Sequence, residues 1–339
     1  MATMRKLVMK GPKESEIITV ERPVINKPTE VLVKLHYCGV CMSEHYDWTT
    51  APAGRTFGHE PMGTVVEVGE GVKNIKVGDR VSMGSGGGAE YSKLDEKWVH
   101  KLPDNVEDHQ GIIEPLWCLV SAVSKVRLPI QSEKVAVVGC GYMGCGAISL
   151  LAMRGVKVVA VDINPESLKN ALKYGACEAY LPEELPDEYI TTKNTYKGVD
   201  VETAVKSAAE TGFPLVMEWG ETAESLDLAI RMTRQCGQLA IGAYHTGGKR
   251  LVDVQLLNVR AIDCLSTHPR ESDLNQRSAV CAMRMLGDDT WNYKHVPTKV
   301  YPASMFDKAH EELEIKFGKW MKSVIDWENE DFEPYIIND

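Results

Sequence analysis

The sequence lacks long apolar runs, an excess of basic residues and a signal-like start. No stretch of its 339 residues approaches the roughly 20 apolar residues that a membrane-spanning helix needs, so we expect a soluble chain. Its 48 acidic residues outnumber the 38 basic ones, and the net charge of -10 repels phosphate backbones and anionic lipid surfaces. Nucleic acids and membranes are therefore not expected as partners.

The cysteines do not suggest a disulfide framework, because nine is an odd number in a chain too long to need such cross-links. Met1 to Lys10 also lacks the apolar core of a secretory signal. Both features predict a cytoplasmic protein. Seven of the cysteines are expected to be small buried core residues, namely Cys118, Cys140, Cys145, Cys177, Cys236, Cys264 and Cys281.

Two domains are expected, because single cores stop growing at about 250 to 300 residues. Residues 30–99 alternate and turn often, which predicts an antiparallel β-rich domain. From 134 to 268 strands, glycine turns and helices follow one another, which predicts a parallel α/β domain. The later residues carry a helical stretch at 306–316 and are expected to return to the first domain. The predicted domains are 1–118 with 269–339, and 119–268.

The second domain opens with a strand, a glycine-rich turn and a helix. After the strand Lys134 to Val138 comes Gly139-Cys140-Gly141-Tyr142-Met143-Gly144, followed by a helix that Gly155 ends. In such a unit Gly139 permits the tight turn, Gly141 lets the backbone approach a pyrophosphate, and Gly144 lets helix and strand pack closely. The N-terminus of the helix then offers N–H groups to the phosphates. The pattern predicts a dinucleotide site.

Asp162 indicates which dinucleotide is bound. It ends the next predicted strand, Val156 to Val161, at about the 20-residue spacing of a ribose-binding carboxylate. A carboxylate there accepts hydrogen bonds from the ribose hydroxyls and repels a 2'-phosphate, so NAD is favoured over NADP. The alternative is a structural turn in which Asp162 only caps a helix.

Potential metal ligands occur in the first domain. Cys41 follows a predicted strand, His59 and Glu60 are adjacent, and Glu114 lies just before the second domain. Thiolate, imidazole and carboxylate suit tetrahedral Zn²⁺, and a catalytic zinc keeps one position open. Taken singly, Cys38 and Cys41 could be a redox pair, His59 a core histidine and Glu114 a surface carboxylate.

At this point the chain resembles the zinc-dependent medium-chain dehydrogenases/reductases. Residues 58–69, which begin Gly-His-Glu, and the Val-Gly-Asp-Arg-Val of 77–81 are similar to that family's signature. Residues 38–44, Cys-Gly-Val-Cys-Met-Ser-Glu, resemble its zinc-binding cysteine segment. The nucleotide motif and the segments 217–220 and 238–242 fall in family order. The resemblance implies a GroES-like β-rich catalytic domain and a doubly wound Rossmann domain.

The resemblance also implies the site residues. Cys41 and His59 would be ligands, Glu60 a ligand or an exchangeable neighbour, and Glu114 the remaining ligand. The Glu-Pro-Leu of 114–116 is similar to the polyol, sugar and threonine dehydrogenase branch. The four-cysteine lobe that holds a structural zinc in many members is missing between residues 81 and 91, so one catalytic zinc per chain is expected.

The implied reaction is hydride transfer between a secondary alcohol and NAD, with zinc as Lewis acid. Ser43 is the candidate to take the hydroxyl proton, although it could instead be a local cap. Two departures leave the onward route open: Glu44 stands for the usual Asp, and Tyr46 for a proton-passing histidine, which the adjacent His45 could replace.

Three functions compete. The first is a zinc- and NAD-dependent dehydrogenase of polyols, sugars or cyclitols. The second is a zinc-free quinone or enoyl reductase on the same fold, and the third is a non-catalytic NAD-binding protein.

Family members are commonly dimers or tetramers that pair in part through the last strand of the nucleotide sheet, here predicted at 261–266. His245 and His268 follow predicted strands and could face the cleft, although we expect them to be structural or at the surface.

Overall fold

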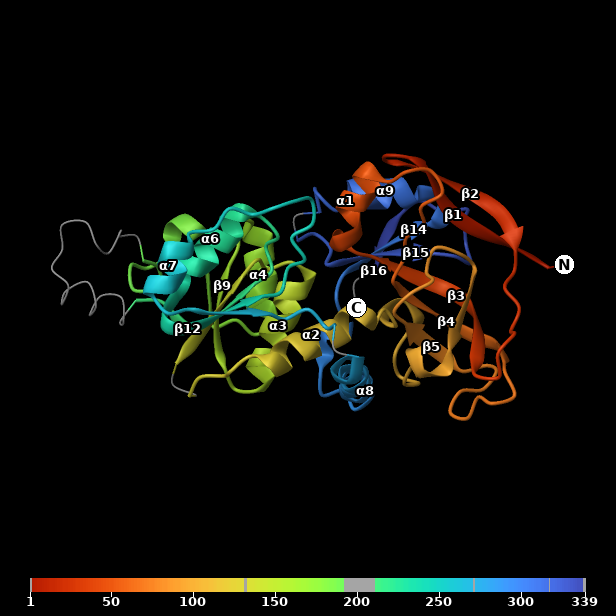
Figure 1. Cartoon of the computed structure of the whole chain (residues 1–339), viewed down its shortest axis with the longest axis horizontal. Coiled ribbons are helices and arrows are strands. Elements are labelled where there is room, and N and C mark those ends of the chain that lie inside the picture. Colours follow the sequence, from red (N-terminus) through yellow and green to blue (C-terminus); the bar gives the residue numbers. More distant parts are fainter. Residues whose placement is uncertain (1, 131–132, 192–210, 271, 317, 338–339) are drawn as a thin grey trace. The chain divides into compact units, whose positions relative to one another are not determined.

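The structure is a computed structural model that describes residues 2–130, 133–191, 211–270, 272–316 and 318–337. It divides into two compact units (Figure 1): unit 1 is Met1–Cys118 with Asp273–Asp339, and unit 2 is Leu119–Ser272. Each unit has its own sheet and core. Every helix among the described residues is too short or too polar to cross a bilayer.

Unit 1 is built on an eight-stranded sheet and a separate hairpin. Its strands are β1 (Thr3–Gly11), β2 (Glu14–Glu21), β3 (Glu30–Val40), β4 (Glu60–Val68), β5 (Arg80–Met83), β6 (Tyr91–Asp95), β7 (Val99–Lys101), β14 (Thr298–Pro302), β15 (Lys322–Asp326) and β16 (Tyr335–Ile337). Its helices are α1 (Met42–Thr50), α2 (Glu114–Lys125), which continues into unit 2, α8 (Ser272–Gly287) and α9 (Phe306–Glu311).

β3 is the central strand of unit 1. It pairs antiparallel with β4 on one side and with β6 and then β15, at successive stretches, on the other, so residues far apart in the sequence lie side by side. Its first half is buried on both faces, because Val31, Val33 and Leu35 on one face and Leu32 on the other are enclosed. The expected β-rich domain is confirmed, with the parallel pair β14 and β15 as its one departure among the described strands.

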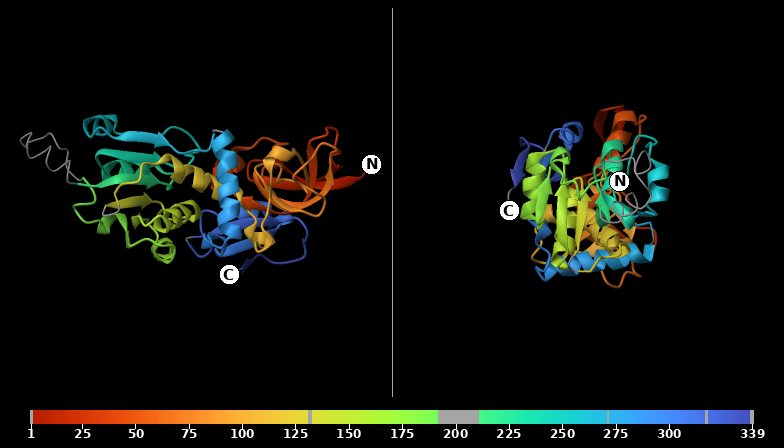
Figure 2. Two further views of the ribbon diagram at one scale, coloured as in Figure 1. Left: turned by 90° about the horizontal axis from the view of Figure 1, so that it is seen from below. Right: turned by 90° about the vertical axis from the view of Figure 1, so that its left-hand side faces the viewer.

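Unit 2 is the predicted doubly wound fold. Its parallel strands are β8 (Lys134–Val138), β9 (Lys157–Val161), β10 (Glu178–Tyr180), β11 (Phe213–Glu218), β12 (Thr233–Ile241) and β13 (Asp263–Ser266), in the order β10-β9-β8-β11-β12-β13. Helices α3 (Tyr142–Met153), α4 (Pro165–Lys173), α6 (Ala223–Met232) and α7 (Val254–Val259) connect them, and helices cover both faces of the sheet (Figure 2). The strand order reverses between β8 and β11, where such sheets bind dinucleotides.

Two sequence expectations are wrong. The helix predicted over 306–316 ends at Glu311, and the chain after it forms turns. The apolar periodicity of that stretch does not require a regular helix. Only Cys140 and Cys145 of the seven cysteines are fully buried, and Cys118 is partly buried. Four are exposed, since they lie in a turn, at a left-handed position of β12, in an edge strand and on an outer helix face: Cys177, Cys236, Cys264 and Cys281.

The core of unit 1 encloses a histidine that has no hydrogen-bond partner among the described residues. His310 of α9 is fully buried, and its ring packs on Phe306 and Trp48 with centroids 4.5 and 5.4 Å away. Neither ring nitrogen has a hydrogen-bond partner among the described residues. Burial, helped by the nearby His45, lowers the pKa of His310 to about 3.

This burial predicts a loss of stability in acid. In the unfolded chain His310 is protonated as pH falls below about 6.5. In the folded protein it is protonated only near pH 3, because burial lowers its pKa. Between pH 7.5 and pH 5 the free energy of unfolding should therefore fall by about 2 kcal/mol from this residue. His310→Phe should remove that part of the fall in urea unfolding at the two pH values. An equal fall in the variant would contradict the assignment.

Candidate functional site

Three of the predicted metal ligands lie together in unit 1. Cys41 is the N-cap of α1 directly after β3, and His59 and Glu60 stand at the start of β4. One possible ligand atom from each lies within 4.8 Å of the others. No second cluster of three such residues occurs in the part of the chain that the structure describes.

Glu60 is held in place by a glycine and a lysine on the neighbouring strands. Gly39 of β3 faces Glu60 across the β3–β4 ladder, and a Cβ at Gly39 would collide with the Glu60 carboxylate. β15 pairs with the other edge of β3 and brings in Lys322, whose ammonium group forms an ion pair with Glu60. The glycine therefore makes the room in which the two buried charges meet.

Lys322 is the residue that reasoning from the sequence missed. Its ammonium also donates to the carbonyl of Val40, at 3.3 Å. Burial alone would lower its pKa, but the negative charges of Glu60 and Cys41 outweigh burial and raise it. A signal was available, because a lysine at the start of the fully buried strand β15 needs a charged partner.

His59 is oriented by a carboxylate from α1. Oε1 of Glu44 lies 2.9 Å from Nδ1 of His59 and also accepts from the N–H of Gly58 at 2.9 Å. Burial alone would lower the pKa of His59, but its hydrogen bonds with Cys41 and Glu44 raise it. With Nδ1 bonded to Glu44, the other ring nitrogen is left for Cys41 or a metal, as in carboxylate–histidine–zinc sites.

Glu114, the fourth predicted ligand, lies close by but outside the three-residue cluster. It is the first residue of α2, and its Oε1 accepts from the thiol of Cys118 at 3.2 Å. Burial raises the pKa of Glu114 to about 7, opposed by the charge of His59 and reinforced by that of Glu60. Cys118 thus holds the carboxylate from one side.

The residues present fit a divalent metal ion. Oε1 of Glu60 is buried and has no hydrogen-bond partner among the described residues, an arrangement that costs free energy unless a cation completes it. The donor set of one thiol, one imidazole and carboxylates suits zinc. The negative charges of two carboxylates and one thiolate, from Glu60, Glu114 and Cys41, would also be balanced by the positive charges of Lys322 and a divalent ion.

The predicted proton-relay residues lie on α1. The Ser43 hydroxyl donates to the sulfur of Cys41 at 3.2 Å, so it lies beside the cluster. Nε2 of His45 lies 2.9 Å from the carboxylate of Glu314, and its ring contacts Trp48. Tyr46 is exposed.

The glycine-rich loop at 84–88 packs closely on the segment before His59, where the N–H of Gly87 donates to the Gly58 carbonyl at 2.8 Å.

In unit 2 the glycine-rich turn has the predicted shape. Gly139 has a φ of 87°, and a Cβ there would come within 2.6 Å of the Gly220 nitrogen. Gly144 packs against the Gly139 carbonyl, where no side chain would fit, whereas a Cβ on Gly141 would meet nothing within 4 Å. No side chain caps α3 at Gly141, and its first turn, Tyr142 and Met143, follows directly. This open helix N-terminus fits a pyrophosphate.

Asp162 follows β9 and is tied to the same turn. Its Oδ2 accepts from the N–H of Cys140 at 2.6 Å and its Oδ1 from the N–H of Asn164 at 2.8 Å. Burial raises its pKa. The carboxylate therefore stabilises the turn, and each oxygen keeps a second lone pair for a ribose hydroxyl.

Comparisons with known proteins identify the family of both units. The alcohol dehydrogenase GroES-like domain family matches residues 27–104, and the NAD-binding domain family of 3-hydroxyacyl-CoA dehydrogenase matches residues 134–240. The (R,R)-butanediol dehydrogenase of Bacillus subtilis (strain 168) is 32% identical over 250 residues, which are 60% of this chain and 70% of that protein. The chain is a zinc-dependent medium-chain dehydrogenase/reductase.

Further relatives of this dehydrogenase cover the whole chain. Sorbitol dehydrogenase of Mus musculus is 27% identical across 97% of both chains. The crystal structure of 2R,3R-butanediol dehydrogenase from Bacillus subtilis superposes with a TM-score of 0.72 and 23% identity, over 95% of this chain and 99% of that one. The expected family and fold class are thus confirmed, and the dehydrogenase is an oxidoreductase of the alcohol dehydrogenase type.

The contact between Glu44 and His59 predicts an effect on metal affinity. Glu44→Ala should weaken zinc binding to the dehydrogenase about 10- to 100-fold, because the imidazole loses the partner that orients it. Asp47→Ala, which removes an exposed carboxylate of the same helix paired only with Arg55 in the described structure, should leave the affinity unchanged. Competition with a chelating dye measures both, and equal affinities for wild type and Glu44→Ala would refute the role.

Proposed function

We propose that this dehydrogenase oxidises a secondary alcohol group of a polyol, sugar or cyclitol with NAD, using one zinc ion per chain. The observation that carries the proposal is the cluster of Cys41, His59 and Glu60 beside Glu114, in a chain whose other unit has an open dinucleotide turn. Relatives named as butanediol, sorbitol and D-xylulose enzymes support a polyhydroxy substrate.

Cys41, His59 and Glu114 would hold the zinc, with Glu60 as a further ligand or an exchangeable neighbour. Zinc, when bound, supplies a Lewis acid for the alcohol oxygen, and NAD supplies the hydride acceptor. Lys322 pairs with Glu60 and limits the negative charge at the site. Ser43, beside Cys41, would take the proton of the substrate hydroxyl.

The number of zinc ions follows from the distribution of possible ligands. The described residues contain one cluster of three or more His, Cys, Asp and Glu side chains, which supports one catalytic ion and no structural ion. We assign metal binding to unit 1 and NAD binding to unit 2. The cysteines are all unpaired, which is consistent with a cytoplasmic protein.

A dimer or tetramer is part of the proposal. β13 lies at the edge of the nucleotide sheet and is largely exposed, so its unpaired backbone groups can add to the same strand of a second copy. Light scattering should then give a molar mass that is a multiple of the 37.6 kDa chain, and a monomer would contradict this part of the proposal.

Metal analysis and turnover test the function together. Purified protein should contain one zinc per chain and form NADH with polyols, sugars or cyclitols in a panel that also includes simple and amino alcohols. Cys41→Ala should lose the zinc and about a thousandfold in kcat/KM, whereas Cys177→Ser, at an exposed thiol, should keep both. A metal-free protein that turns over equally well, or an active Cys41→Ala, would defeat the proposal.

A further inference from the structure

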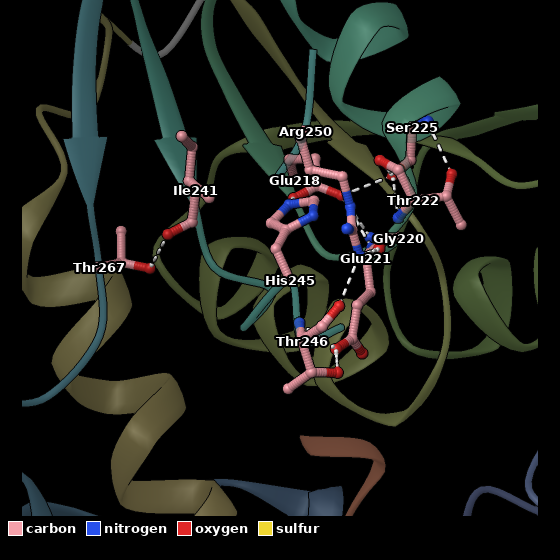
Figure 3. A network of polar contacts seen from close by, with 10 residues as sticks. All are labelled: Glu218, Gly220, Glu221, Thr222, Ser225, Ile241, His245, Thr246, Arg250 and Thr267. Atoms are coloured by element: carbon pink, nitrogen blue, oxygen red, sulfur yellow. Dashed lines mark hydrogen bonds and ion pairs between the residues drawn. The ribbon is translucent and has the colours of Figure 1, made fainter. Parts of the chain in front are cut away.

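A wholly buried carboxylate lies at the end of β11. Oε1 of Glu218 accepts hydrogen bonds from the N–H groups of Gly220 and Glu221, at 2.7 and 3.0 Å, and from the Ser225 hydroxyl at 2.7 Å. Its Oε2 lies 2.9 Å from Nε2 of His245, which comes from the loop after β12 (Figure 3). Since an ionised carboxylate only accepts, His245 donates through Nε2.

In a neutral imidazole, this bond fixes the chemistry of the other ring nitrogen. A neutral imidazole with its proton on Nε2 carries a lone pair on Nδ1 and is an acceptor there. Nδ1 of His245 is buried and has no hydrogen-bond partner among the described residues, while the side chain as a whole is 13% exposed. Glu218 thus holds the ring of His245 in a fixed orientation, and Nδ1 is an acceptor for which the described structure supplies no donor.

The two loops that carry the pair are fastened to each other. The Glu221 carboxylate accepts from the N–H and the hydroxyl of Thr246, at 3.2 and 2.8 Å. Arg250 donates to the carbonyls of Glu221 and Thr246, at 3.2 and 2.8 Å (Figure 3). His245 and Glu221 both have left-handed backbones, with φ of 51° and 63°, a conformation that persists only where contacts enforce it.

The pair lies in the half of the nucleotide sheet opposite Asp162. β8 carries the glycine turn, Asp162 follows β9 on one side of it, and Glu218 ends β11 on the other side. Gly139 packs directly on the backbone of Trp219 and Gly220, which links the turn to the Glu218 loop. A dinucleotide whose pyrophosphate rests on α3 and whose adenosine ribose meets Asp162 extends its other half over β11 and β12.

We propose that His245, positioned by Glu218, binds the nicotinamide half of NAD(H) by accepting a hydrogen bond at Nδ1. The donor is either a hydroxyl of the nicotinamide-side ribose or the carboxamide N–H. The inference rests on the proposed use of NAD. His245 is the cofactor-binding residue, and Glu218 is a positioning residue that acts through it by fixing the tautomer.

Three ligands measured by calorimetry locate the contact. ADP ends at the pyrophosphate, ADP-ribose adds the second ribose and NADH adds the nicotinamide. His245→Asn, which tolerates the left-handed backbone but is too short to span the site, should bind ADP as wild type does. It should bind NADH about tenfold more weakly, which is about 1.4 kcal/mol. Equal weakening of ADP-ribose assigns the ribose as donor, and unchanged ADP-ribose assigns the carboxamide.

Glu218→Gln tests the positioning role without removing volume. Its amide would donate to Nε2 of His245 and move the ring proton to Nδ1, so the acceptor is lost. The ¹⁵N NMR signals of His245 should show the other tautomer, and NADH binding should weaken as in His245→Asn. Asp227→Asn, the same change at a carboxylate of α6 that pairs with Arg231 and lies outside the two loops, is the matched control and should change NADH binding less than twofold.

Unchanged NADH binding in His245→Asn, equal weakening of ADP, or an equal effect of Asp227→Asn would overturn the inference, since each is expected of a purely structural histidine. Failure of the wild type to bind ADP and NADH would overturn the NAD assignment and this inference with it. Wild-type binding that His245→Asn leaves intact would overturn this inference alone.

Discussion

The ion pair between Glu60 and Lys322, both buried beside the missing side chain of Gly39, is the constraint on which the metal site depends. A buried carboxylate without a partner would be costly, so Glu60 needs Lys322. The charges of this pair cancel, so the pair alone would not attract a metal ion. Cys41 and His59 supply the further donors at the ends of neighbouring elements. The eight-stranded sheet sets these positions, because β4 and β15 flank β3 and so bring together residues from distant parts of the chain.

Unit 2 uses a buried carboxylate in a comparable way. Glu218 accepts four hydrogen bonds and leaves one imidazole nitrogen as an acceptor, while Glu60 keeps one oxygen without a hydrogen-bond partner among the described residues. In both places the protein completes most of the bonding of a group and leaves one position for a ligand. Such preorganisation reduces the reorganisation needed on binding.

The sequence was informative where function requires a local pattern. The strand, glycine turn and helix around Gly139 are contiguous, so their periodicity and spacing predicted the Rossmann unit. Lys322 and the Glu218–His245 pair could not be placed in the same way, because each contact joins segments separated by many residues and depends on strand order. The exposure of Cys264 likewise follows from β13 lying at a sheet edge, which composition does not reveal.

X-ray absorption at the zinc edge of the metal-loaded protein tests the central claim most directly, because it counts the atoms around the ion without reference to turnover. The account predicts one sulfur from Cys41, one imidazole from His59 and oxygen atoms for the remaining positions. Two or more sulfurs, or none, would contradict the proposed ligand set and the role assigned to the Glu60–Lys322 pair.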